Sequence, residues 1–118
     1  MNYLCLIYLD QENWDACPDN VCAEYGLRLH ESGHSIAAGP LHPVDTAMTI
    51  RVRDGQMLLT DGPFAETKEM LAGFFMLKAK DLNEAIQLAA GIPSAKYGSV
   101  EVRPMRPLDV GSAGASSP

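Results

Sequence analysis

The sequence of 118 residues lacks several features that would point directly to a partner. No apolar run reaches the roughly 18 residues that a membrane-spanning helix needs, and none follows a basic start as a secretory signal would. Basic residues are few, since 9 Lys and Arg stand against 15 Asp and Glu, for a formal net charge of −6. Because binding to a phosphate backbone requires a basic face, we expect neither a nucleic-acid partner nor a membrane partner.

Motifs for common cofactors are absent as well. The sequence contains no Walker loop, GxGxxG, GxSxG or CxxC pattern, so we expect no nucleotide, dinucleotide or other cofactor. Cysteine is scarce: Cys5, Cys17 and Cys22 make an odd number, and no second pair completes a zinc site. Without an export signal, this pattern predicts reduced thiols and a cytoplasmic location, with Cys5 as a small core residue.

Hydrophobic periodicity predicts one α+β domain over residues 1–107, followed by a small, polar and flexible tail at 108–118. Apolar alternation indicates strands, and Asp54-Gly55 indicates a hairpin turn between two of them. The expected strands are 2–9, 35–39, 46–53, 56–60, 72–79 and 99–104. Amphipathic helices are expected at 21–32 and 81–90, the second capped by Asp81 and Glu84.

This order, β-α-β-(β-hairpin)-β-α-β, predicts a ferredoxin-like sheet with both helices on one face, because right-handed crossovers place them there. Two helices cover only one face, yet the strands at 2–9 and 72–79 are apolar on both. The second face therefore needs a cover that the predicted elements do not supply. The simplest cover is a second copy packed sheet to sheet, so we expect a homodimer.

Charged residues on the strands suggest where a ligand would bind. Alternation assigns the helix-covered face to Met48, Ile50, Val52, Val100 and Val102. It assigns the opposite face to Thr49, Arg51, Arg53, Glu101 and Arg103. Such charges either lie at a rim or line a wet cleft, where arginines would bind an anionic group such as a carboxylate. The alternative is a plain ion pair on an edge strand between Glu101 and an arginine.

The most distinctive segment is DGPFAETKE at 61–69. Asp61 ends a strand beside the Gly62-Pro63 turn, and a carboxylate at that position beside a cleft suits a general base. The alternative is that Asp61 only accepts hydrogen bonds from turn amides, with Glu66 in a solvated charged stretch.

With this nonapeptide the chain resembles the YCII-related family, in its DGPFAETKE branch. RVRDG at 51–55, AGFFML at 72–77, DLNEA at 81–85 and VEVRPM at 100–105 extend the resemblance over most of the chain. The resemblance implies a ferredoxin-like dimeric α/β barrel of largely unassigned activity. Relatives of that fold include muconolactone-isomerase-like enzymes and small monooxygenases. Genes of this branch often lie beside extracytoplasmic-function sigma factors, which implies a regulatory association.

The broader family also implies a catalytic Asp–His pair in a cleft. Carried over to this sequence, Asp61 is the motif aspartate. The histidine stays open, because His42 lies in a loop able to return to the cleft and His34 follows the first helix.

One segment, His30 to His34, matches HExxH, the pattern in which two histidines on one helical face bind zinc. We expect Gly33 to break the helix before the second turn is complete. Ala37 and Pro40 stand where an extended motif would need glycine and histidine. We therefore expect no metal site.

Two functional hypotheses follow. The first is a dimeric module that binds a small, anionic molecule in a cleft and acts alongside a sigma factor. Its expected ligand-binding residues are Arg51, Glu66, Glu101 and Arg103. The second is a cofactor-free isomerase or lyase that uses Asp61 as general acid or base, His42 as its partner and an arginine to stabilise an oxyanion.

Overall fold

The computed structural model describes residues 1–109, and residues 110–118 of the expected tail lie outside that range. Its strands are β1 (Asn2–Asp10), β2 (Ser35–Pro40), β3 (Met48–Arg53), β4 (Gln56–Asp61), β5 (Glu69–Lys78) and β6 (Ser99–Pro104). Its helices are α1 (Asp19–Glu31) and α2 (Leu82–Ala90), with short 3-10 turns η1 (Val44–Thr46) and η2 (Pro93–Lys96). Within residues 1–109, neither helix is long and apolar enough to cross a membrane.

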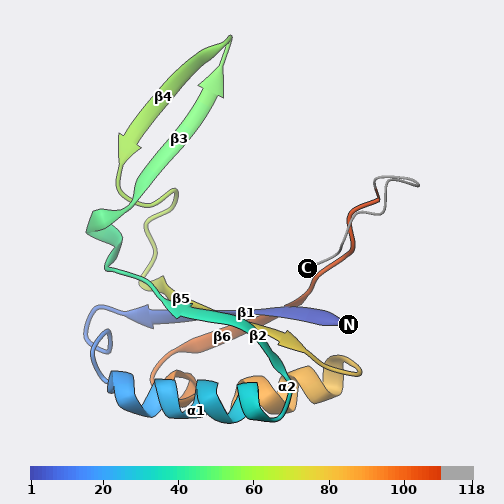
Figure 1. Cartoon of the computed structure of the whole chain (residues 1–118). Helices are drawn as coiled ribbons and strands as arrows, with labels where there is room; N and C mark the ends of the chain where they lie inside the picture. Colours follow the sequence, from blue (N-terminus) through green and yellow to red (C-terminus); the bar gives the residue numbers. More distant parts are fainter. Residues whose placement is uncertain (110–118) are drawn as a thin grey trace.

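Four of the strands form an antiparallel sheet in the order β2-β5-β1-β6. Both helices lie on one face of this sheet (Figure 1). Without the β3–β4 hairpin the element order is β-α-β-β-α-β, which is the ferredoxin-like arrangement. The expected α+β fold, with two helices on one side of an antiparallel sheet, is confirmed.

The core lies between the sheet and the helices, and β1 shows how the sequence builds it. Burial alternates along this strand, with Tyr3, Cys5, Ile7 and Leu9 buried and the residues between them half-buried. Leu77 of β5, Leu29 of α1 and Ile92 belong to one buried cluster with Cys5, Ile7 and Leu9, whereas Tyr3 belongs to a second, smaller one. Val100 and Val102 of β6 pack against this core, as alternation predicts.

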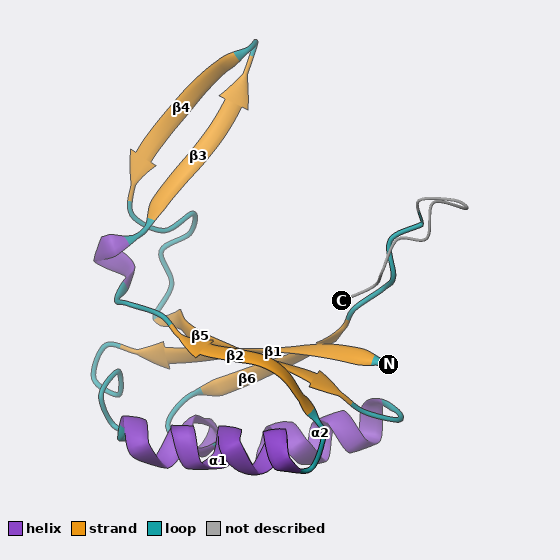
Figure 2. Ribbon diagram, viewed as in Figure 1, coloured by secondary structure: helices purple, strands orange, loops and turns teal. Residues whose placement is uncertain are grey.

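The hairpin departs from the expected single sheet. Among the described strands, β3 and β4 pair with each other as a separate two-stranded sheet. Figure 2 shows this hairpin projecting from the side of the four-stranded sheet opposite to the helices. The assignment of Met48, Ile50 and Val52 to the helix-covered face is therefore wrong, and their side chains are 56%, 60% and 62% exposed. Alternation predicts that a strand has an apolar face, but it does not say which surface covers that face.

Local chemistry explains why the hairpin forms and where it starts. Asp54 and Gly55 have φ angles of 52° and 75°, the left-handed conformations of a two-residue hairpin turn, so the expected turn is confirmed. At the other end, the Gly62 amide donates to the Ala47 carbonyl at 2.8 Å, and the Thr49 hydroxyl donates to the Gly62 carbonyl at 2.9 Å. These bonds join the two linkers at the base of the hairpin.

The chain exposes more surface than its size predicts. Its accessible surface is 8216 Å², against about 6,300 Å² for a compact monomer of 12.8 kDa. The radius of gyration is 16.3 Å, against about 13.5 Å for a compact domain of this length. We use the name open face for the side of the sheet away from the helices. Its half-buried apolar side chains are Leu4, Leu6, Tyr8, Phe74 and Met76.

Candidate functional site

A cavity of about 610 Å³ lies where the start of α1, the 11–18 loop, the end of β2 and the middle of β5 meet. Its wall is largely apolar and includes three aromatic residues: Trp14, Phe75 from the core-facing side of β5, and the neighbouring Phe74. We refer to it as the pocket. Its volume lies within the roughly 300–1,000 Å³ typical of small-molecule sites.

An irregularity in the sheet helps to shape the floor of this pocket. The register between β1 and β5 shifts at Ile7/Tyr8, and a bulge of this kind bends the strand. At the same point β2 approaches β5 closely, since a Cβ added to Gly73 would lie 2.9 Å from the Gly39 carbonyl oxygen. Only glycine fits at this approach, so Gly73 fixes one side of the pocket.

The 11–18 loop supplies the outer wall. Both the backbone amide and the side-chain amide of Asn13 donate to Asp10 Oδ1, each at 2.9 Å, and this anchors the start of the loop to the end of β1. Trp14 is half-buried and packs against the main core cluster. Neither the length of this loop nor its tryptophan shows from the sequence alone that the loop encloses a cavity.

The polar groups of the pocket are two thiols, a hydroxyl and two carboxylates. Cys17 Sγ and Cys22 Sγ lie 2.8 Å apart, and Cys22 Sγ lies 3.7 Å from Ser94 Oγ. Burial raises the pKa of the Cys17 thiol to about 11, and its hydrogen bond to Cys22 adds to the effect. Asp15 and Asp19 also contribute, whereas no Lys, Arg or His of the described chain lines this wall. The electrostatics of the pocket therefore do not favour an anion.

The six residues that the sequence singled out lie elsewhere. Four of them belong to the hairpin and its linkers, namely His42, Arg51, Asp61 and Glu66. The other two, Glu101 and Arg103, lie on β6. In the single chain these groups are divided between two separate sheets, because Arg51 is part of β3–β4 and Arg103 is part of the four-stranded sheet.

Asp61 is exposed at the end of β4. Within residues 1–109 its carboxylate makes no hydrogen bond or ion pair, so turn amides do not account for its presence, and His42 is not bonded to it. Arg51 lies with its guanidinium carbon 5.5 Å from the centre of the Phe64 ring, a cation–π contact within the same motif.

Glu101 and Arg103 form an ion pair with each other on β6, which is an edge strand of the sheet. This is the plain alternative that the sequence left open for Glu101. Arg103 is 69% exposed, so the pair is solvated and contributes little to stability.

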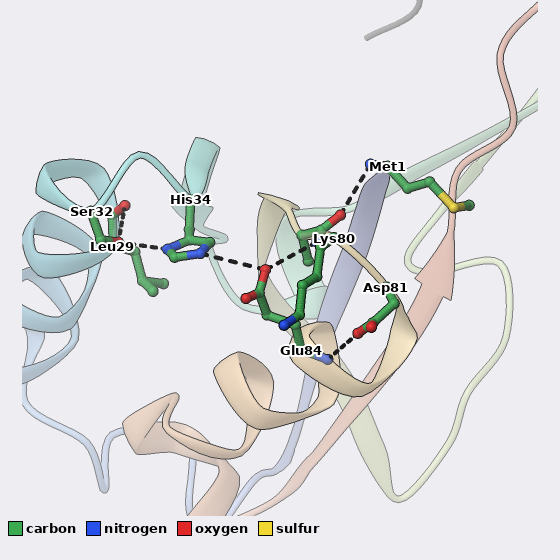
Figure 3. A network of polar contacts seen from close by, with 8 residues as sticks. Met1, Leu29, Ser32, His34, Lys80, Asp81 and Glu84 are labelled. Carbon is green, nitrogen blue, oxygen red and sulfur yellow. Dashed lines mark hydrogen bonds and ion pairs between the residues drawn. The ribbon is translucent and has the colours of Figure 1, made fainter.

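The HExxH segment is occupied by contacts that join the two helices (Figure 3). Helix α1 ends at Glu31 and Gly33 has a φ of 82°, so the expected break is confirmed. His34 Nδ1 lies 2.7 Å from Ser32 Oγ, and His34 Nε2 lies 3.6 Å from Glu84 Oε1 at the start of α2. No group of three or more His, Cys, Asp or Glu among residues 1–109 is arranged to hold a metal ion.

Glu84 and Asp81 cap the start of α2 in the same network. Asp81 Oδ1 accepts from the Glu84 amide at 2.8 Å, as the expected capping box requires. Glu84 Oε1 accepts from the amide of Lys80 at 3.0 Å, one residue before the position that a capping box predicts.

Comparison with known proteins places the chain in a family. The model of the YCII-related domain matches residues 1–109. The chain belongs to the YCII-related domain family. An uncharacterized protein of Rhizobium meliloti (strain 1021) is 40% identical to this YCII-related protein over 77 residues, which are 64% of this chain and 62% of that one. The matched segment thus spans less than two thirds of that relative.

A solved structure resembles the fold. It is 5-chloro-2-hydroxyhydroquinone dehydrochlorinase of Burkholderia phenoliruptrix AC1100, in complex with 2,5-dihydroxybenzoquinone. The TM-score is 0.56 at 16% sequence identity, over 92% of this chain and 97% of that one. At this identity the likeness shows the fold alone.

Proposed function

We propose that this YCII-related protein binds a small organic molecule in the pocket between the 11–18 loop, α1 and β5. The observation that carries the proposal is the cavity of about 610 Å³ with Trp14, Phe74 and Phe75 in its wall. Aromatic walls favour a ligand with a flat apolar face, and a few polar groups fix its orientation. The fold neighbour, which is a dehydrochlorinase in complex with a small cyclic molecule, supports small-molecule binding on this fold.

The polar groups of the pocket favour an uncharged ligand over an anionic one. The Ser94 hydroxyl and the thiols of Cys17 and Cys22 offer hydrogen bonds, while Asp15 and Asp19 repel negative charge. The small, anionic ligand that the arginines predict would therefore bind at a different site.

A homodimer would provide that site. The hairpin has one face of exposed apolar side chains, and it projects from the same side as the open face. The side chains of the hairpin face are Met48, Ile50, Val52, Met57 and Leu59. An isolated two-stranded hairpin is only marginally stable in water. The accessible surface of this chain also exceeds that of a compact monomer by more than the roughly 800 Å² that each partner buries in a standard interface. We propose that the hairpin of one copy covers the open face of another.

Such a dimer favours a second candidate function, the binding of a carboxylate or similar anion between copies. Arg103 lies on the open-face side of β6, because its neighbour Val102 packs against the core, whereas Arg51 lies on the face of the hairpin opposite to Ile50 and Val52. An exchanged hairpin would therefore place one copy's Arg51 at the rim of the cleft, and the other copy's Arg103 would be the cation that faces into it. Glu101 and Glu66 would complete the polar rim of this cleft. If Asp61 and His42 enter the same cleft, the protein would act as a cofactor-free isomerase or lyase, with the unbonded Asp61 carboxylate as general acid or base.

An association with an extracytoplasmic-function sigma factor and a cytoplasmic location belong to the same proposal. The association rests on the family resemblance, and the location rests on the scarcity of cysteine, which is typical of proteins in a reducing compartment. Co-purification of the sigma factor with the tagged chain from the native host tests the association, and its absence at native expression levels would remove it.

The experiment that tests the pocket uses a neutral and an anionic ring compound, benzamide and benzoate, observed by ligand NMR. We expect the chain to bind benzamide. Ala23→Phe should abolish that binding, because Ala23 lines the pocket and phenylalanine would fill it. The matched control Ala90→Phe, at an exposed alanine of α2 outside the pocket, should keep it.

The same experiment separates the two sites. Benzoate binding that survives Ala23→Phe but is lost in Arg103→Gln would assign the anion site to the dimer cleft. Benzamide binding that persists unchanged in Ala23→Phe would contradict the pocket as the binding site. Enzyme and binder then differ in whether the bound compound is consumed over time.

A further inference from the structure

Two of the three cysteines meet at the wall of the pocket. Cys17 stands at the end of the 11–18 loop, and Cys22 lies in the first turns of α1. Their sulfur atoms are 2.8 Å apart, within about 1 Å of the roughly 2.05 Å bond length of a disulfide. A small movement of one side chain brings the two sulfur atoms to bonding distance.

The surroundings leave this pair accessible and set it apart from the third cysteine. Both residues are half-buried and line the cavity, with Cys17 Sγ also 3.8 Å from the Pro18 carbonyl and Cys22 Sγ 3.7 Å from Ser94 Oγ. Cys5, in contrast, is 0% exposed in the core. A reagent that enters the pocket therefore reaches one pair of thiols only.

We propose that Cys17 and Cys22 form a reversible intramolecular disulfide that fixes the outer wall of the pocket. The proposal does not rest on the small-molecule function above, since the bond forms or fails to form whether or not the pocket takes a ligand.

The structure indicates what the bond would stabilise. The start of the 11–18 loop is held by Asn13 and Asp10, but its other end passes through Pro18, the N-cap of α1, which supplies no side-chain hydrogen bond. A bond from Cys17 to Cys22 would tie that end to the helix. The segment between the two anchors carries Trp14 and Asp15, so the bond would restrict two residues of the pocket wall.

Formation of the Cys17–Cys22 bond needs an oxidant, and a low-molecular-weight disulfide such as oxidised glutathione can act as that oxidant. One cysteine loses its proton and attacks the glutathione disulfide, which forms a mixed disulfide and releases one glutathione. The second cysteine then loses its proton and attacks the mixed disulfide, which forms the Cys17–Cys22 bond and releases the second glutathione. The two protons end on the two released thiols, so two protein thiols are oxidised and one glutathione disulfide is reduced.

The test uses the full chain, first reduced and then incubated with excess oxidised glutathione. After free thiols are alkylated, cleavage at aspartates separates the cysteines, because Asp10 and Asp15 lie between Cys5 and Cys17 and Asp19 lies between Cys17 and Cys22. We expect mass spectrometry to find the Cys17 and Cys22 peptides linked, with the mass lower by two hydrogen atoms. Cys5 should be alkylated, and dithiothreitol should restore both free thiols.

Three outcomes would overturn the proposal. They are complete alkylation of Cys17 and Cys22 after oxidation, glutathione retained on either residue, and a link to a cysteine of another chain. The decisive measurement is made on the unaltered sequence, so it does not depend on any variant folding. As a matched control, Cys22→Ser should convert the product to a glutathione adduct on Cys17.

The effect on the pocket wall has its own readout. Trp14 is the single tryptophan of the chain and lines the cavity, so its fluorescence reports on that wall alone. We expect oxidation to change the emission reversibly in the natural sequence and to leave it unchanged in the double variant Cys17→Ser/Cys22→Ser, which offers no thiol in the pocket to oxidised glutathione. Unchanged emission in a chain shown to carry the bond would contradict the claim that the bond fixes the wall.

Discussion

The four-stranded sheet and the β3–β4 hairpin are built from the same kind of sequence, but only one of them is covered. Leu77 on β5 and Leu59 on β4 are both strand leucines in antiparallel pairs. Leu77 is 0% exposed beneath the helices, whereas Leu59 is 54% exposed. The two regions therefore differ in what lies against them and not in their local pattern.

Apolar alternation therefore predicts that one face of a strand is buried, but it does not identify the surface that covers that face. The helix-covered face of the sheet finds its cover in α1 and α2, which the chain itself supplies. The hairpin and the open face find none within residues 1–109, and they point to the same side of the molecule. We propose that a second copy covers both.

Replacing each of the two leucines with alanine tests this difference between the sheet and the hairpin. Leu77→Ala should lower the free energy of unfolding by about 2–5 kcal/mol, because it leaves a cavity at a fully buried site. Leu59→Ala should change it by less than about 0.5 kcal/mol when the solution is dilute enough to keep the chain monomeric. Urea titration of both variants measures this. Similar losses at the two sites would show that the hairpin is packed within the single chain.

The next prediction sharpens the role of the hairpin's apolar face. Leu59→Asp should raise the dimer dissociation constant at least tenfold, about 1.4 kcal/mol, because it places a charge where an apolar surface is buried. Thr60→Asp, the next residue on β4 and on the opposite face, is the matched control and should change it little. Analytical ultracentrifugation over a concentration series measures both. Equal effects would mean that the apolar face is not the contact.

A smaller effect is expected inside the covered region. Tyr25 donates to the Leu88 carbonyl at 2.6 Å, so Tyr25→Phe should cost about 0.5–1.5 kcal/mol of unfolding free energy at neutral pH. Chemical denaturation at pH 7 measures the loss. An unchanged stability would show that this bond between α1 and α2 contributes nothing.

Tyr25 also predicts a dependence on alkaline pH. Burial raises the pKa of the Tyr25 phenol, although nearby Arg28 opposes this, so the folded state holds the proton more tightly than the unfolded state. The resulting stability is complete below the ordinary tyrosine pKa of about 10 and is lost as pH rises through the folded value. Tyr25→Phe should lose less stability in that range. Burial raises the pKa of Cys5 to about 11, and this adds the same alkaline loss to both proteins.

The smallest effect is expected at Asp61. Asp61→Asn should change the unfolding free energy by less than about 0.5 kcal/mol, because the carboxylate is exposed and has no bonded partner within residues 1–109. Asp81→Ala, which removes the cap of α2, should lower the unfolding free energy by about 0.5–2 kcal/mol in the same assay. This control shows that the assay can resolve small losses of stability. A large loss at Asp61 would assign that residue a structural role.

Local chemistry made much of the fold predictable from the sequence. Asp54-Gly55 marked the hairpin turn, Gly33 marked the end of α1, and Asp81 marked the start of α2, because each of these conformations depends on the residues themselves. The position of the hairpin outside the four-stranded sheet could not be predicted, because the linkers on either side of the hairpin set that position. Strand alternation carries no information about linkers.

The pocket was missed for a similar reason. It depends on a shift in register at Ile7/Tyr8, on the close approach at Gly73 and on the tertiary meeting of Trp14 with the start of α1. Cys17 and Cys22 do not have the two-residue spacing of a CxxC motif, so the meeting of their sulfur atoms could not be predicted.

The measurement that tests the central claim most directly is sedimentation equilibrium of the full chain at micromolar concentrations. If a second copy covers the hairpin and the open face, the fitted mass is twice the 12.8 kDa of one chain. A mass that stays at 12.8 kDa up to the highest concentration would contradict the account.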